Sequence, residues 1–111
     1  MPTPIPLDDP RVLREISGIL KAMADPTRLR LLQEILAGER GVTELVGAAG
    51  TSQANVSKHL AVLREAGIIE GLRNGAQVFY ALRVPCVLNF FGCVEAVMRS
   101  KAKEQMKLIG K

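Results

Sequence analysis

Residues 43–66 contain two stretches of helical periodicity separated by a glycine. Thr43 is a candidate N-cap for a short first helix, which Gly50 interrupts. Thr51 or Ser52 then caps a second helix, which runs to the end of the segment. Two helices joined by a tight glycine turn form a helix-turn-helix. The segment therefore predicts a small helical fold built around this pair.

A β-hairpin is predicted after the second helix. Two β-prone runs, 68–73 and 76–82, flank the dipeptide Asn74-Gly75. Asn-Gly between two such runs is the strongest short-range signal for a hairpin. Pro85 marks the end of the hairpin.

Two further helices are predicted before residue 43. The first spans about 10–23 and carries an apolar face. The second begins at Asp25-Pro26, because Asp is a favoured N-cap and Pro a favoured first helical residue, and it ends at Gly38. The apolar face of the first helix consists of Val12, Ile16, Ile19, Leu20 and Met23.

One long helix is predicted over about 86–108, with an apolar first half and a basic second half. Residues 1–9 contain three prolines and are expected to form a flexible N-terminal arm. Residues 10–111 then form one domain. Its expected order is helix, helix, short helix, helix, hairpin and long helix, which is mainly α with a small β-hairpin.

Composition agrees with a mainly helical domain. The chain of 111 residues is 48% hydrophobic but only 4% aromatic, so its core must consist of aliphatic side chains and Met. No apolar run reaches the roughly 18–20 residues of a membrane span, so we expect no membrane association. The first ten residues do not resemble a signal peptide. Two cysteines cannot form a disulfide framework, so we expect free thiols and a cytoplasmic protein.

The second helix of the helix-turn-helix opens with polar side chains suited to DNA. Gln and Asn can pair with adenine in the major groove, whereas Ser and Lys bind phosphates as readily as bases. The alternative is an amphipathic helix whose polar face is merely solvated. The glycine turn, the cap and the hairpin together favour DNA. The predicted contacts of this helix are Ser52, Gln53, Asn55, Val56, Ser57, Lys58 and His59.

The hairpin tip offers a second contact. Arg73, Asn74 and Gln77 supply one cation and two amides, which can reach an adjacent groove and neutralise phosphate. The alternative is a hairpin tip without a binding role.

Three separated motifs resemble the ArsR/SmtB family of bacterial winged helix-turn-helix repressors. They are the run 24–32 (ADPTRLRLL), the run 52–69 (SQANVSKHLAVLREAGII) and the hairpin with Tyr80. The resemblance extends over about 10–108. It implies a homodimer formed by the first and last helices, which binds double-stranded operator DNA with twofold-related half-sites. It also implies that DNA is released when a metal or another inducer binds.

The apolar half of the last helix supports a dimer independently. Phe90 and Phe91 stand together in it, and a single chain of this length can hardly bury every side of such a helix. Twofold pairing would place two recognition helices about 34 Å apart, one turn of DNA.

The inducer sites of the best-known relatives are absent. The arsenic, cadmium and lead sensors carry Cys-x-Cys in the third helix, where this chain has Val46, Gly47 and Ala48 nearby and no cysteine. The zinc sensors carry Asp and His pairs on the last helix, whereas the one histidine here is His59.

Cys86 and Cys93 are therefore the candidate inducer site. Seven residues apart on one helix, they would share a face about 10.5 Å apart along the axis. Bridging them by a disulfide or one metal ion would require unwinding near Pro85 or help from the other subunit. Thiolates select thiophilic ions such as As(III) and Sb(III), and some arsenite-responsive relatives have a similar cysteine pair. No obligatory cofactor is expected.

Two other roles for the cysteines stay open. Redox- and persulfide-sensing relatives use two cysteines, although one of theirs lies on the second helix, where this chain has none. Alternatively, both residues pack as small hydrophobic side chains in a dimer core.

Other classes of function were weighed against a repressor. The chain contains no nucleophile–base pair in a recognisable constellation and no glycine-rich phosphate loop, so we expect no enzyme. A winged-helix module that binds proteins and not DNA is the alternative from another class.

Overall fold

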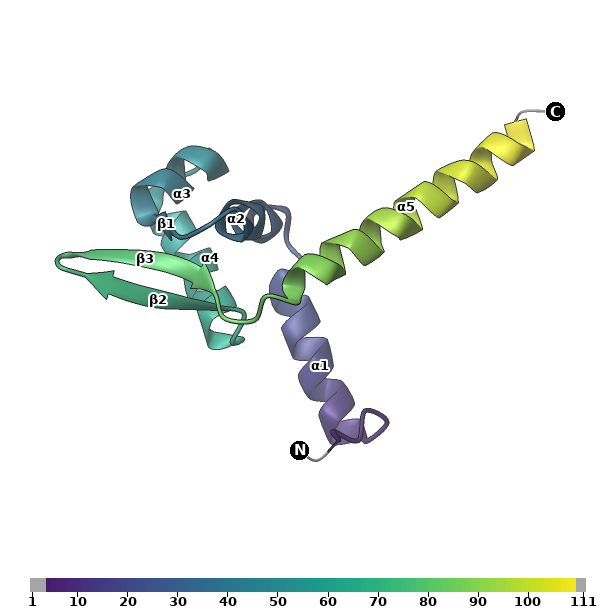
Figure 1. Ribbon diagram of the computed structural model, residues 1–111, viewed down its shortest axis with the longest axis horizontal. Coiled ribbons are helices and arrows are strands. Elements are labelled where there is room, and N and C mark those ends of the chain that lie inside the picture. Colours follow the sequence, from purple (N-terminus) through teal and green to yellow (C-terminus); the bar gives the residue numbers. More distant parts are fainter. Residues whose placement is uncertain (1–3, 110–111) are drawn as a thin grey trace.

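The computed structural model describes residues 4–109, and in this range it contains five helices and three strands (Figure 1). The predicted order is confirmed, with one additional strand. The elements are α1 (Pro10–Met23), α2 (Pro26–Leu36), β1 (Arg40–Gly41), α3 (Val42–Ala49), α4 (Gln53–Glu65), β2 (Ile69–Asn74), β3 (Gln77–Leu82) and α5 (Val87–Ile109).

The core lies where α2, α3 and α4 meet the base of the hairpin. Its fully buried side chains are all aliphatic, as the composition predicts. Burying a side chain of this kind stabilises the fold by about 1.5–3 kcal/mol. The largest of them are Leu31, Leu32, Leu45, Val56, Leu60, Leu63 and Ile69.

Side-chain caps fix the starts of α2 and α4. The Asp25 carboxylate accepts a hydrogen bond from the Arg28 backbone N–H at 3.0 Å, and the Ser52 hydroxyl accepts one from the Asn55 N–H at 3.1 Å. Between α3 and α4, Gly50 adopts a left-handed conformation with φ of +67°, which favours glycine. The turn and the second helix of the predicted helix-turn-helix are thus formed by the residues expected to form them.

The start of α3 differs from the prediction. Thr43 does not cap this helix; Gly41 is the N-cap, and its N–H donates to the Glu44 carboxylate at 3.3 Å. The reason is the strand β1, in which Arg40 and Gly41 pair with Tyr80 and Phe79 of β3. Pairing holds the chain extended up to Gly41, so the helix begins directly after it.

The hairpin turn is shifted by one residue. Asn74 pairs with Gln77, so the two turn residues are Gly75 and Ala76, whereas Asn74-Gly75 was predicted. Gly75 has φ of +68°. Among the described positions, every residue with positive φ is a glycine. A glycine at the first turn position with positive φ is typical of a type II′ turn, which needs no Asn before it. The sheet order is β1-β3-β2.

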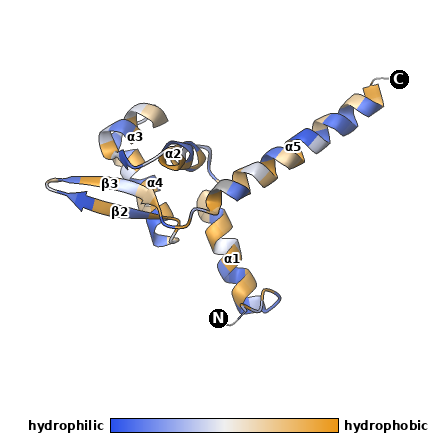
Figure 2. Ribbon diagram, viewed as in Figure 1, coloured by the Kyte–Doolittle hydropathy of each residue, from blue (hydrophilic) through white to orange (hydrophobic). Residues whose placement is uncertain are grey.

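Both terminal helices extend away from this body. α1 and α5 diverge from one end of it, and most of α5 has no neighbour (Figure 1). The molecule accordingly measures 60 × 39 × 23 Å. Hydrophobic residues recur along α1 and the first half of α5 (Figure 2). Among residues 4–109, no helix is both long enough and apolar enough to cross a bilayer.

The predicted arm falls partly within the described residues. Residues 1–3 lie outside them, as do residues 110–111 of the predicted domain. Before α1 the chain turns back, with the Asp9 N–H donating to the Pro6 carbonyl at 3.0 Å, and Asp9 then caps α1. The boundary between arm and domain stays a prediction.

Candidate nucleic-acid interface and thiol site

The outer face of the first half of α4 is exposed and polar. Gln53, Ser57 and Lys58 are exposed there, beside the capping residue Ser52. Ser57 and Lys58 lie one turn beyond Gln53, so the three side chains follow a single surface of the helix. The structure therefore brings together four of the predicted contacts.

Asn55 is only partly available. Its side-chain amide donates to the Thr51 hydroxyl at 3.3 Å, and the residue is half-buried. One donor of the amide is thus engaged within the chain, which leaves the carbonyl oxygen and the second N–H.

Val56 was wrongly predicted as a contact. Its side chain is fully buried between the helices, in the same row as Leu60 and Leu63. Spacing of three and four residues puts these three on the inner face of α4, so helical periodicity already carried the signal.

His59, which was predicted to face DNA or solvent, is largely buried in the structure. Only 18% of its side chain is exposed, and the ring faces the start of α2. Its Nδ1 lies 3.3 Å from a guanidinium nitrogen of Arg28 and 3.9 Å from the Asp25 carboxylate. Arg28 and Asp25 were not predicted as partners of this residue, because a contact across 31 positions leaves no trace in local periodicity.

The hairpin tip is exposed as predicted. Arg73, Asn74 and Gln77 all lie in its solvent-facing end. A groove of about 430 Å³ separates the tip from the start of α3. It is lined by residues 41–44 of α3 and its cap and by residues 76–79 of the hairpin.

The positive charge of Arg40 is offset by two neighbouring carboxylates. The Arg40 guanidinium lies 3.9 Å from carboxylates of both Glu34 and Glu44. Arg40 thus serves to join α2, β1 and α3, whereas Lys58 and Arg73 carry exposed charge toward solvent.

The carboxyl of Asp25 is held in its ionised form. Its pKa lies below the usual value, chiefly because it accepts the hydrogen bond from the Arg28 backbone N–H. The charge of Arg28, and that of His59 when its ring is protonated, act in the same direction, while burial acts against it.

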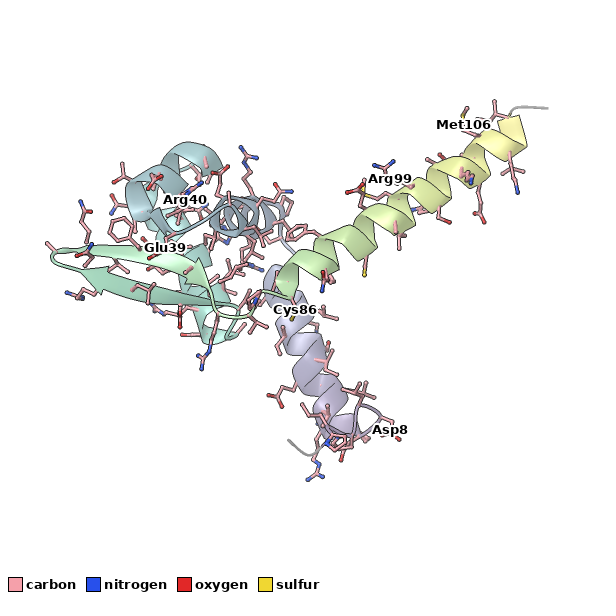
Figure 3. All side chains as sticks on the ribbon, in the orientation of Figure 1. Asp8, Glu39, Arg40, Cys86, Arg99 and Met106 are labelled. Carbon is pink, nitrogen blue, oxygen red and sulfur yellow. The ribbon has the colours of Figure 1, made fainter. Side chains whose placement is uncertain are left out.

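Both thiols are free and exposed, but only one belongs to the helix. Cys86 lies in the turn before α5 (Figure 3), where its carbonyl accepts from the Asn89 N–H at 3.0 Å. Cys93 lies in the second turn of α5. Cys86 thus immediately precedes the first residue of α5, and the shared helical face of the two thiols stays a prediction. Within residues 4–109 no three His, Cys, Asp or Glu side chains come together as a metal site.

An apolar groove of about 370 Å³ runs between α1, α2 and α5. Phe90 and Phe91 form one wall, with their rings edge to face at 6.2 Å. Beyond the groove, Val97 and Met98 continue the apolar surface of α5 and are 58% and 65% exposed. The full lining is Leu20, Met23, Ala24, Leu29, Phe90, Phe91 and Val94.

Known proteins resemble this chain in sequence and fold. Residues 25–70 match the family described as bacterial regulatory protein, arsR family. A probable mercury resistance operon repressor of Streptomyces lividans is 48% identical over 69 residues, which are 62% of this chain and 55% of the repressor. The chain thus matches a little over half the length of this relative.

Two solved structures share nearly the whole fold. The transcriptional repressor BigR from Xylella fastidiosa is 32% identical with a TM-score of 0.71, covering 85% of this chain and 96% of BigR. The homodimeric winged helix-turn-helix domain Mb0332 of Mycobacterium bovis, described as a possible ArsR-family regulator, is 25% identical with a TM-score of 0.76. That match covers 94% of this chain and 95% of the domain.

These relatives are regulators and not enzymes, as the sequence predicted. The helix-turn-helix of α3 and α4, the hairpin after it and the terminal helices correspond to theirs over the greater part of the chain. The chain belongs to the arsR family of bacterial regulatory proteins, with the winged helix-turn-helix fold.

Proposed function

We propose that this protein is a transcriptional repressor that binds double-stranded operator DNA as a homodimer in the cytoplasm. The observation that carries the proposal is the exposed polar face of α4, formed by Ser52, Gln53, Ser57 and Lys58 on a winged helix-turn-helix scaffold. In such scaffolds the second helix enters the major groove with its N-terminal residues at the base edges.

The hairpin tip supplies a second point of attachment. Arg73 bears an exposed cation, and Asn74 and Gln77 bear amides next to it. A cation at the end of a projecting hairpin neutralises phosphate beside the groove that α4 occupies. Phosphate contacts fix orientation, whereas Gln53 and Asn55 are the side chains suited to reading bases.

The dimer is proposed to form through α1 and α5. The groove beside Phe90 and Phe91 is apolar throughout, and the apolar surface continues to Val97 and Met98. Contiguous exposed apolar surface of this extent on a small protein marks an interaction site. The homodimeric M. bovis relative supports a second copy of the chain as the partner.

The inducer is proposed to act at Cys86 and Cys93. Both thiols are exposed at the base of α5, so a solute can reach them, and thiolates bind soft ions such as As(III), Sb(III) or Hg(II). The Streptomyces relative, by its name, represses a mercury resistance operon. Cys86 lies in the turn at 85–86, directly before the first residue of α5. Oxidation or persulfidation of the same thiols is the second candidate.

DNA binding is tested by footprinting and titration on the DNA upstream of the protein's own gene. Lys58→Ala should raise Kd about fivefold, which corresponds to roughly 1 kcal/mol. It should also reduce the dependence of log K on log salt by about 1 per subunit, because one phosphate contact is lost.

Lys103→Ala is the matched control, since Lys103 is also an exposed lysine and lies on the far half of α5. It should leave Kd and the salt slope at their wild-type values. No protection of DNA by the wild-type protein at low salt would contradict the repressor and favour a protein-interaction module.

A further inference from the structure

A polar cluster under α4 joins three helices. His59 reaches from α4 toward the N-cap of α2, where Asp25 and Arg28 lie. Arg28 also extends back to the last turn of α1, donating hydrogen bonds from Nε to the Ala22 carbonyl and from a terminal nitrogen to the Lys21 carbonyl. A single guanidinium thus contacts the end of α1 and the middle of α4.

The hydrogen bond between Arg28 and His59 determines the role of the Nδ1 atom of the imidazole ring. A guanidinium can only donate, so Nδ1 of His59 must be the acceptor at 3.3 Å. The ring nitrogen nearest the other helices is therefore occupied within the protein. It is not available to a base or a phosphate, although His59 directly follows Lys58 on α4.

The cluster also adjoins the apolar groove. Met23 and Ala24, in and just after the last turn of α1, line the groove against Phe90. The carbonyls that Arg28 holds belong to the two preceding residues, Lys21 and Ala22. One side of this turn consequently faces α5 and the other is bonded to the cluster.

We propose that Asp25, Arg28 and His59 form a junction that sets the orientation of α4 relative to α1. His59 is then a positioning residue for DNA recognition and not a DNA contact. This inference rests on the proposed DNA-binding function. The angle between the recognition helix and the dimerising helix determines whether two copies of α4 meet successive turns of DNA.

The test compares His59→Leu, which removes the acceptor, with His59→Asn, whose side-chain oxygen can take the place of Nδ1. His59→Leu should raise Kd for the upstream DNA about tenfold while leaving the salt slope unchanged, because no phosphate contact is lost. His59→Asn should stay within about threefold of wild type. All variants are measured at a temperature where circular dichroism shows them fully folded.

A double-mutant cycle measures the energetic coupling between Arg28 and His59. Arg28→Met should weaken binding about as much as His59→Leu, and the double variant should be no weaker than either, because both break the same junction. Arg14→Met removes an equal charge from exposed surface of α1 and should have no effect. Additive effects, a salt slope reduced as in Lys58→Ala, or wild-type affinity in His59→Leu would each overturn the proposal.

Hydrogen exchange separates this inference from the proposed function. The Ala24 and Asp25 N–H groups donate to carbonyls of Lys21 and Met23, so their protection reports on the end of α1. Without DNA, His59→Leu should speed their exchange at least fivefold and His59→Asn should not. If the wild-type protein bound no DNA, the repressor would be wrong, and unchanged exchange in His59→Leu would independently overturn the junction.

Discussion

Asp25 stabilises the protein at two points through one carboxylate. It caps α2 by accepting from the Arg28 N–H, and it lies 3.9 Å from the ring of His59. The hydrogen bond from the Arg28 N–H favours the ionised form, and the pKa of Asp25 is lowered accordingly. A side chain at the start of one helix thus contributes to the placement of another.

The lowered pKa of Asp25 predicts how stability depends on pH. An ionised carboxylate with a lowered folded-state pKa stabilises the fold above its unfolded pKa, near pH 4, and this contribution is lost as pH falls through the folded-state value. The urea midpoint should therefore fall between pH 5 and pH 2. It should fall less in Asp25→Asn, which can still cap the helix but has no charge to titrate.

Asp8→Asn is the control for this measurement, because it removes a carboxylate from exposed chain before α1. Its midpoint should follow the wild-type curve. Parallel curves for wild type and Asp25→Asn would show that the Asp25 carboxylate has no such part in acid unfolding.

Neighbouring residues of α4 have opposite environments because each step along a helix turns by about 100°. Val56 is buried, Ser57 and Lys58 are exposed, and His59 is turned back toward α2. The polarity of His59 suggested solvent or DNA, but its position placed it near Asp25 and Arg28, which satisfy its polarity inside the protein.

At the level of elements, one short strand escaped prediction because long-range pairing creates it. β1 has two residues and no alternating pattern of its own; it exists because Tyr80 and Phe79 of β3 lie beside it. Because of this pairing, the N-cap of α3 is Gly41 and not the predicted Thr43.

The inducer proposal concerns the N-terminal end of α5, near which both cysteines lie, and it is tested by measuring release of DNA. Arsenite, antimonite, Hg(II), Cd(II) and a persulfide donor are titrated against the protein–DNA complex. If a thiophilic ion acts at both thiols, Cys86→Ser and Cys93→Ser should each raise the concentration needed for half-release at least tenfold, because one of two ligands is lost.

Ser replaces the thiol with a hydroxyl of similar size, so the fold should be retained and each variant should still bind DNA. Release by the persulfide donor alone would favour the thiol-redox alternative. Unchanged release from both variants would mean that the cysteines have no role in induction.

For the whole molecule, the exposed apolar surface of α1 and α5 predicts the oligomeric state. Val97→Glu places a charge on the apolar surface of α5 and should convert the dimer to a monomer at micromolar concentration, as measured by sedimentation equilibrium. Leu72→Glu is the matched control, since Leu72 is a 40% exposed apolar residue on the hairpin. It should remain dimeric, and a wild-type monomer would contradict the proposed interface.

The sequence alone determined the order and approximate spans of the helices, the presence of the hairpin and the aliphatic nature of the core. These depend on local signals: periodicity in α1 and α4, the caps Asp25 and Ser52, and the break at Gly50. The same periodicity predicted most of the residues on the exposed face of α4.

Only the tertiary structure decided which residues become partners across the chain. Arg28 meets His59 over 31 positions, β1 pairs with β3, and the apolar faces of α1 and α5 lie together around one groove. Such contacts arise when separate elements pack, and the packing depends on the whole set of buried side chains and not on any local run of residues.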